Sequence, residues 1–365
     1  MEGIALFQGN ELLDKELKLF AGDASHTEEH LHEMNQAHTA TGRAVTVSRS
    51  PSLDNEFAEL VQTAKTHIQG VTARPPQPGA GFDEVFAANP VTVVGELHAH
   101  QSPRLTIATK LPELAENKGA LVLEHLYTNR QEMLDEYLRS PPDAPLPPLL
   151  RLTVDFLDRE FAQDSKDGAY YSPKQLILDA KRAGVPVYGI DSDAALANSY
   201  QTIEKNPSSS VKFGNSGNYP EDPYYYRVLT MNENARAVIA HARESCPGKI
   251  LVNVGSCHAR PYDALDVPDI GNLVGGASVV VSDGEKSTSE IIRAKALPSP
   301  SMPQRQSGDF LSITADPKSL KQELAMQKAM QKFRAVPKST GVSSAHPSGV
   351  PPKPKAQDLV TARTK

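Results

Sequence analysis

The sequence has few of the features of a disulfide-rich, membrane-spanning or nucleic-acid-binding protein. Its 365 residues include no tryptophan and only two cysteines, Cys246 and Cys257, which are too few for a disulfide framework. No apolar run approaches the roughly 18 residues of a membrane span. The first residues lack the basic and apolar regions of a Sec signal peptide, and a net charge of −6 argues against nucleic acid as the main partner. We therefore expect reduced thiols and a cytoplasmic protein, or one secreted without a Sec signal as an injected effector would be.

Composition divides the chain into three parts. Residues 1–53 are polar and rich in histidine and glutamate, which predicts a disordered or loosely helical segment. Residues 54–295 carry regular apolar patterns and form the predicted domain. Residues 296–365 are rich in proline, serine and lysine, which predicts a disordered tail with one isolated helix at 317–335. A host-protein partner, if the protein has one, would be recruited through these tails.

A short motif in the first part could be taken for a zinc site. His26, Glu29 and His30 fit the inverted motif H-x-x-E-H. That motif needs a helix packed on a core that supplies a third ligand, and the neighbouring residues here are polar. A solvated helix face is the better interpretation.

The middle of the chain alternates between short β-branched runs and amphipathic patterns. A helical pattern at 54–70 comes first. Runs typical of strands lie at 91–96, 120–124, 185–191, 249–255 and 277–282. Helical patterns lie at 102–116, 129–139, 149–162, 173–183 and 225–243. Strands that alternate with helices predict an α/β protein with a mostly parallel central sheet flanked by helices.

Polar side chains follow or end four of these strands. They are Glu96, His98 and His100 at the first, Glu124 and His125 at the second, Asp191 at the third, and His258 at the fourth. Ligands of open α/β folds bind outside the carboxyl ends of parallel strands, so the sequence predicts that these residues converge on one site. For any one of these residues, a helix cap or a solvated loop residue is the better interpretation. The set as a whole favours a site.

Two carboxylates and two imidazoles suit a divalent transition metal such as zinc, manganese or cobalt. We expect its ligands to come from Glu96, His98, Glu124 and His258. Such an ion would polarise a carbonyl and lower the pKa of a bound water towards about 7. A carboxylate left off the metal, Glu96 or Glu124, would be the general base. Metal-free acid–base chemistry by Glu124 and His98 is the rival interpretation, and spacing alone does not separate the two.

Two arginines and one cysteine are further candidates. Arg104 and Arg227 could steady an anionic intermediate or a substrate carboxylate. Arg104 is the better candidate because it lies at the start of the helix directly after the first site strand. Cys257 stands beside His258, but neighbours on a strand point to opposite faces, so a small buried residue is a better interpretation than a nucleophile.

The paired motifs Gly95-Glu-Leu-His98 and Gly255-Ser-Cys-His258, with Glu124 between them, resemble those of the erythromycin esterase/ChaN-like superfamily, which includes the TIKI and TraB proteins. The closer resemblance is to the ChaN-like domain of bacterial dermonecrotic and membrane-targeted toxins and effectors. It covers roughly residues 85–293. The matching stretches are Gly95-Glu-Leu-His-Ala-His-Gln-Ser-Pro-Arg104, Leu123-Glu-His-Leu126, Gly189-Ile-Asp191, Met231-Asn232-x-x-Ala235 and Val254-Gly-x-x-His258.

What the resemblance implies about function is divided. TIKI-like members are metal-dependent proteases and erythromycin esterases open a lactone, which implies a hydrolase acting on a peptide, ester or lactone bond. ChaN binds haem, which implies the alternative of a non-enzymatic effector module that holds haem or another ligand on a vestigial site. Relatives carry an Arg-Asn-x-x-Met motif whose arginine is replaced here by Met231, with Arg227 one turn earlier as a substitute.

We therefore predict a metal-dependent hydrolase-type domain of a bacterial toxin or effector, with a small molecule or a peptide as its substrate. The predicted catalytic residues are Glu96, Glu124, His100 and Arg104. The predicted binding residues are Asp191, Arg227, Asn232 and His125. The third interpretation is a structural scaffold whose polar strand ends only cap helices.

Overall fold

The computed structural model describes residues 51–71, 74–76, 79–162, 170–191, 223–260, 267–292 and 309–335. The motif at His26 to His30 and the chain after residue 335 lie outside these residues, as do the predictions made for them. The chain divides between Ala325 and Met326, and everything described below up to Ala325 belongs to the first unit.

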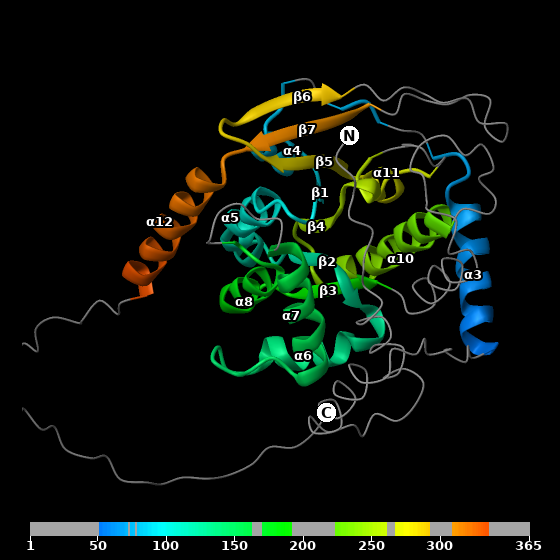
Figure 1. Cartoon of the computed structure of the whole chain (residues 1–365), viewed down its shortest axis with the longest axis horizontal. Helices are drawn as coiled ribbons and strands as arrows, with labels where there is room; N and C mark the ends of the chain where they lie inside the picture. The colour runs from blue at the N-terminus through cyan, green and yellow to red at the C-terminus, as the bar shows by residue number, and fades with distance from the viewer. Residues whose placement is uncertain are drawn as a thin grey trace, which may run out of the picture. The chain divides into compact units, whose positions relative to one another are not determined.

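A seven-stranded sheet with the order β3-β2-β4-β1-β5-β7-β6 forms the centre of the first unit (Figure 1). All of its strand pairs are parallel except β6 with β7, which is antiparallel. This confirms the predicted fold class of a mostly parallel sheet flanked by helices. The strands are β1 (Val91–Glu96), β2 (Ala120–Tyr127), β3 (Val187–Asp191), β4 (Ile250–Gly255), β5 (Ala277–Asp283), β6 (Thr288–Ile292) and β7 (Phe310–Ala315).

Helices cover both faces of the sheet, so its central strands are buried on both sides. Every residue of β1 and β4 is buried, as expected for parallel strands that read as continuous apolar runs. The helices are α3 (Pro51–His67), α4 (Phe82–Ala88), α5 (Ser102–Glu116), α6 (Gln131–Arg139), α7 (Pro148–Ala162), α8 (Pro173–Ala183), α10 (Pro223–Ser245), α11 (Ile270–Val274) and α12 (Pro317–Ala335). Short 3₁₀ turns lie at η1 (Thr128–Arg130) and η3 (Ser256–His258).

Side-chain alternation along the strands divides the core into two layers. On one face, Val94 of β1 packs with residues of α4, α5, α6, α7 and α8. On the other face, Val91 and Val93 pack against α10 and α11. Successive strand residues point to opposite faces, which is why neighbours in β1 belong to different layers. In Figure 1, α5, α7 and α8 accordingly lie on one side of β2 and β4, and α10 on the other.

One strand lies in the part of the sequence that we assigned to the tail. Strand β7 pairs with β5 and β6, and its Leu311, Ile313 and Ala315 are buried in the core. Leu324 of α12 is buried in the same core layer, so α12 is not isolated. The strand is only six residues long and follows a proline- and serine-rich stretch, and that average composition hid its alternation.

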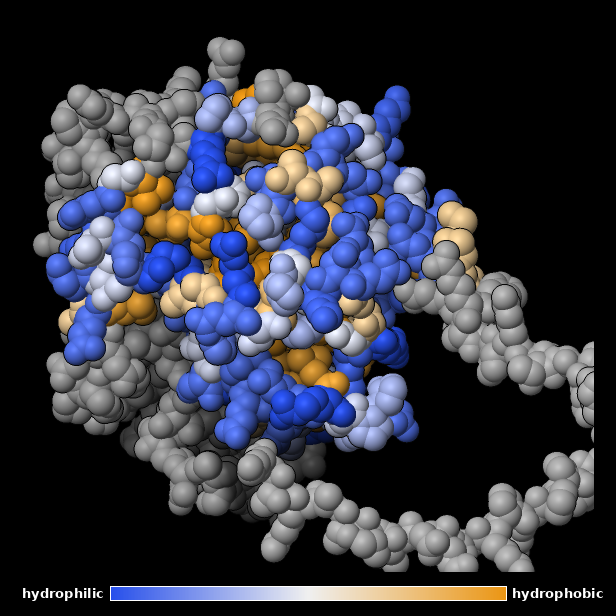
Figure 2. All heavy atoms as spheres, turned by 180° about the vertical axis from the view of Figure 1, so that it is seen from behind, coloured by the Kyte–Doolittle hydropathy of each residue, from blue (hydrophilic) through white to orange (hydrophobic). Residues whose placement is uncertain are grey.

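The exposed surface carries both hydrophilic and apolar residues. In the view from behind, hydrophilic residues cover most of the described surface and apolar residues show between them (Figure 2). Among the described residues, no helix combines the length and the apolar character needed to cross a membrane.

Candidate functional site

The candidate site lies at the carboxyl ends of four neighbouring strands, β3, β2, β4 and β1. Glu96, Asp191 and Gly255 are the last residues of their strands, and Glu124 lies three residues before the end of β2. Because these strands run parallel, their carboxyl ends share one edge of the sheet, which is where open α/β folds bind ligands. The structure thus brings together residues that are up to about 160 positions apart in the sequence.

Three side chains at this edge could hold a metal ion. One ligand atom each from His98, Glu124 and His125 lie within 4.8 Å of one another, and all three residues are partly buried. The rings of His98 and His125 meet edge to face with centroids 4.9 Å apart. This is the only such group found among the described residues. It includes His125 and leaves out Glu96 and His258, two of the four ligands that the sequence suggested.

A β-bulge explains how His125 reaches the site. Residues 124 and 125 would point to opposite faces of a regular strand. The pairing of β2 with β3 shifts register between Leu123 and Tyr127, and His125 has a positive φ of 67°. A bulge of this kind turns a side chain away from its regular direction, and such bulges are frequent next to active sites. Period-two reasoning from the sequence could not find this turn.

Glu96 supports His98 rather than facing the cluster. Its Oε1 accepts hydrogen bonds from Arg104 Nη1 at 2.7 Å and from His98 Nδ1 at 3.0 Å, and its Oε2 accepts one from Asn253 at 3.1 Å. Burial raises the pKa of Glu96, but Arg104 and His98 outweigh it and leave this pKa below its usual value. An ionised carboxylate only accepts, so Nδ1 of His98 carries a hydrogen and Nε2 is left for a ligand.

Arg104 is almost fully buried and connects Glu96 to the backbone around His98. Besides Glu96, it donates to the carbonyls of His98, His100 and Tyr171 and to the hydroxyl of Tyr170. The Tyr170 hydroxyl donates in turn to the His98 carbonyl at 3.1 Å. The sequence predicted Arg104 here but missed Tyr170, which follows a stretch with no periodic signal. The ring of His100 is turned elsewhere, because its Nδ1 accepts from the backbone N–H of Asp283 at 3.1 Å.

The end of β5 fixes the start of α5 and with it Arg104. The Asp283 carboxylate accepts hydrogen bonds from the backbone N–H groups of Gln101 and Ser102. These are orphan donors at a helix N-terminus, where a carboxylate also interacts favourably with the helix dipole. The interaction joins residues more than 180 positions apart and therefore left no local signal.

His258 approaches Glu124 from the other side of the cluster. Its Nε2 lies 3.8 Å from Glu124 Oε1, and its Nδ1 lies 2.7 Å from Asn232 Oδ1. Burial is the main cause that lowers the pKa of His258 to about 4, so the ring is neutral at pH 7. The backbone N–H of Gly255 donates to Glu124 Oε2, which leaves Oε1 directed at the imidazoles.

Arg227 and Asp191 form a buried pair beside Glu124. Both guanidinium Nη atoms of Arg227 contact the Asp191 carboxylate, with Nη2 and Oδ2 at 2.8 Å, and Nη2 lies 3.9 Å from Glu124 Oε1. Burial opposes the charge on Arg227, but Asp191 and Glu124 outweigh it and raise its pKa. Both were predicted as binding residues, and the pair places the Arg227 guanidinium, itself bound to Asp191, at the edge of the cluster.

The residues present fit a divalent transition metal. Imidazole and carboxylate are the ligands that such ions take, and the carboxylate behind His98 is the usual support of a metal-bound histidine. A Cβ added to Gly255 would lie 3.3 Å from Glu124 Oε2 and 3.4 Å from His98 Nε2, so the glycine leaves room between two of these side chains. Burial and the neighbouring His98 lower the pKa of His125 to about 3, so this imidazole is neutral at pH 7.

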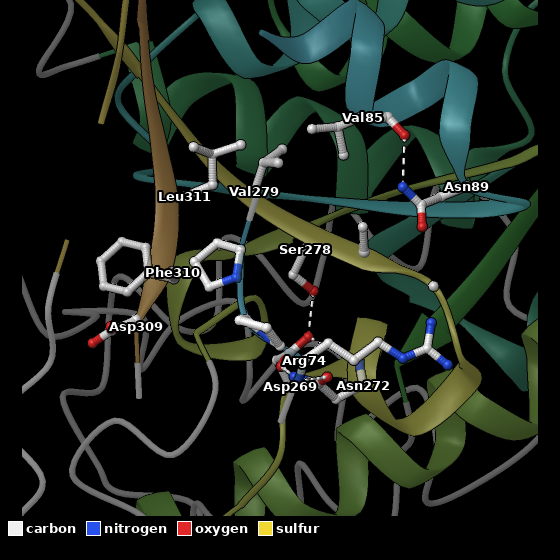
Figure 3. Close-up of a pocket in the computed structure, with 14 residues that line it drawn as sticks. Arg74, Val85, Asn89, Asp269, Asn272, Ser278, Val279, Asp309, Phe310 and Leu311 are labelled. Atoms are coloured by element: carbon white, nitrogen blue, oxygen red, sulfur yellow. Dashed lines mark hydrogen bonds between the residues drawn. The ribbon is translucent and has the colours of Figure 1, made fainter. Parts of the chain in front are cut away.

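A larger cavity of about 230 Å³ lies away from this site, around the amino ends of β5 and β7 (Figure 3). Its buried acid, Asp269, is the N-cap of α11 and accepts hydrogen bonds from Asn272 and Ser278. Asn89 donates to the Val85 carbonyl at 2.8 Å. These polar groups are engaged in holding helix ends, so we place the candidate site at the carboxyl edge of the sheet.

Neither a protein-family model nor a curated protein sequence matches this chain. Several solved structures show a likeness in fold. RRSP, a MARTX toxin effector domain from Vibrio vulnificus, is 16% identical with a TM-score of 0.38, over 70% of this chain and 46% of that one. The type III effector HopBA1 is 15% identical with a TM-score of 0.37, over 68% and 98% of the two chains.

ChaN of Campylobacter jejuni, which binds haem cofacially, is 13% identical with a TM-score of 0.39, over 65% of this chain and 93% of that one. The chain thus spans less than half of the RRSP structure that it matches. A likeness at this level of identity and TM-score identifies neither a substrate nor an activity.

Proposed function

We propose that the first unit is a metal-dependent hydrolase whose ion is held by His98, Glu124 and His125. The observation that supports this is the approach of three ligand atoms to within 4.8 Å of one another at the carboxyl edge of the sheet. Zinc, manganese and cobalt are the candidate ions. When bound, the ion supplies Lewis acidity that polarises the carbonyl of a peptide, ester or lactone substrate.

The chain's own residues orient this set. Glu96 and Arg104 hold the ring of His98 with Nε2 towards the cluster, as a carboxylate hydrogen-bonded to the far nitrogen of a metal-binding histidine does. The Gly255 N–H holds one oxygen of Glu124 and leaves the other free to bind. Arg227 adds a positive charge next to Glu124, where it can attract a substrate carboxylate or steady developing negative charge.

A haem or other ligand on a non-enzymatic effector remains the alternative from the sequence, with a host protein as the partner. The cavity that touches both Glu96 and Glu124 measures about 20 Å³, which is room for about one water molecule. A porphyrin would have to lie outside this cavity. The hydrolase is our first choice because His98, Glu124 and His125 form a group of metal-type ligands at this edge of the sheet.

Metal analysis of the purified full chain tests the proposal. We expect a stoichiometric divalent metal in the wild type, and its loss in His98→Ala and Glu124→Ala. His241→Ala is the matched control because His241 is an exposed histidine on α10 whose Nδ1 lies 3.6 Å from Glu244 Oε2, outside the proposed site. Hydrolysis of peptide, ester and lactone probes should then follow the metal content of each variant.

Two outcomes would contradict the proposal. If the wild-type protein binds no zinc, manganese or cobalt at micromolar concentration, the proposed metal site is wrong. A Soret band that forms on addition of haem and is unaffected by chelation and by Glu124→Ala would favour the non-enzymatic alternative.

A further inference from the structure

We propose that Asn232 is a positioning residue that fixes the tautomer of His258, so that Nε2 of this histidine presents a lone pair to Glu124. The inference deepens the proposed function, because His258 borders the proposed metal site. It concerns the metal-free protein and can be tested without any activity.

Asn232 lies in α10 with only 1% of its surface exposed. Its Nδ2 is 2.9 Å from the carbonyl oxygen of Pro268, and its Oδ1 is 2.7 Å from His258 Nδ1. An amide in the interior of a helix has a lower helix propensity than leucine or alanine, and burying it costs free energy unless its hydrogen bonds are made. Both ends of this amide have partners, and one of them is a site residue.

The directions of these hydrogen bonds follow from the chemistry of the partners. A backbone carbonyl can only accept, so the group of Asn232 that faces Pro268 must be the NH₂. The oxygen of the amide therefore faces His258, and an oxygen of this kind can only accept. Nδ1 of His258 must carry the hydrogen, and Nε2 of the neutral ring must then be unprotonated.

The carbonyl that orients Asn232 is itself held in place. Pro268 directly precedes Asp269, the N-cap residue of α11, and the Asp269 side chain is bound by Asn272 and Ser278. The end of α11 thus orients Asn232, and Asn232 orients His258. Without this chain of contacts, nothing in the chemistry of the imidazole would favour Nδ1–H strongly over Nε2–H.

The consequence appears at Glu124. His258 Nε2 lies 3.8 Å from Glu124 Oε1, and in the tautomer set by Asn232 both atoms are acceptors. Two acceptors that face each other favour a cation or a donor between or beside them. With the other tautomer, Nε2–H would donate to Glu124 and would satisfy the carboxylate that the proposed site needs free.

Histidine-selective ¹⁵N labelling of the metal-free full chain at pH 7 tests the inference by NMR, with His258 assigned from its loss in His258→Gln. We expect an unprotonated Nε2 and a protonated Nδ1 in the wild type. Asn232→Asp keeps an acceptor and should keep this tautomer. Asn232→Leu removes the acceptor and should raise the Nε2–H form. Asn234→Leu is the control, since the side chain of Asn234 donates to the backbone carbonyls of Ile190 and Asp191 in β3.

A wild-type His258 with Nε2–H, or an unchanged tautomer in Asn232→Leu, would overturn the inference. If Asn232→Leu does not fold, the wild-type spectrum still decides, because a neutral His258 ring with Nε2–H contradicts the inference. A wild type with Nδ1–H that binds no metal would remove the proposed function and leave the role of Asn232 standing.

Discussion

Gly255→Ala should weaken metal binding at the proposed site while leaving the fold intact. Gly255 has φ −56° and ψ 146°, a conformation that any L-residue adopts, so the substitution introduces no backbone strain. The added Cβ would lie 3.3 Å from Glu124 Oε2 and 3.4 Å from Cε1 and Nε2 of His98. The methyl group therefore enters the space between two of the three proposed ligands.

The expected changes in the free energy of unfolding and in zinc affinity can be measured separately. Alanine in place of a glycine with a compatible backbone stabilises by about 0.4–1 kcal/mol through the unfolded chain, and the close contacts offset part of this. We therefore expect the free energy of unfolding to stay within about 1 kcal/mol of the wild type. Zinc affinity should fall about 10–100-fold, the usual cost of disturbing the support of a metal site, which is about 1.4–2.8 kcal/mol.

Competition with a chromophoric zinc chelator measures the affinity, and urea unfolding measures the stability. Gly81→Ala is the matched control, because Gly81 has φ −80° and its added Cβ would meet only the Glu84 side chain, outside the site. Unchanged zinc affinity in a folded Gly255→Ala protein would refute the position of the ion between His98 and Glu124.

Three further predictions concern stability. Glu96→Gln should lower the free energy of unfolding by about 3–5 kcal/mol, since it removes the charged partner of the buried Arg104, and urea unfolding of this variant beside Arg104→Met measures the effect. The pKa of His258 is lowered to about 4 in the folded chain, so on acidification the unfolded chain takes up the proton at a higher pH than the folded chain does. The contribution of His258 to the free energy of unfolding is therefore present above about pH 6.5 and is lost as the pH falls towards 4. The decrease in this free energy between pH 7 and 5 should be smaller in His258→Gln than in the wild type, and equal decreases would contradict the assignment. A chain that ends at residue 296 lacks β7, the partner of β5, and should not show a cooperative unfolding transition by circular dichroism. A chain that ends at residue 335 should show one. Cooperative unfolding of the shorter chain would support the domain boundary that composition predicted.

Much of the fold was predictable because it depends on local pattern. The run at residues 91–94 is apolar and β-branched, and it became a strand buried on both faces. The helix predicted at 102–116 has those same bounds in the structure, because its apolar spacing and its early proline are local signals. Strand β7 was missed because six residues of alternation were outweighed by the composition around them.

The candidate site was likewise predictable only in part from the sequence. The strand pattern alone predicted that Glu96, Glu124, Asp191 and His258 lie near one edge of the sheet, because parallel strands carry their carboxyl ends to the same side. Which side chains face one another at that edge depends on tertiary contacts. Glu96 is taken up by Arg104 and Asn253, and His125 is turned inward by a bulge. These outcomes depend on hydrogen bonds between segments far apart in the chain, and side-chain periodicity carries no information about such partners.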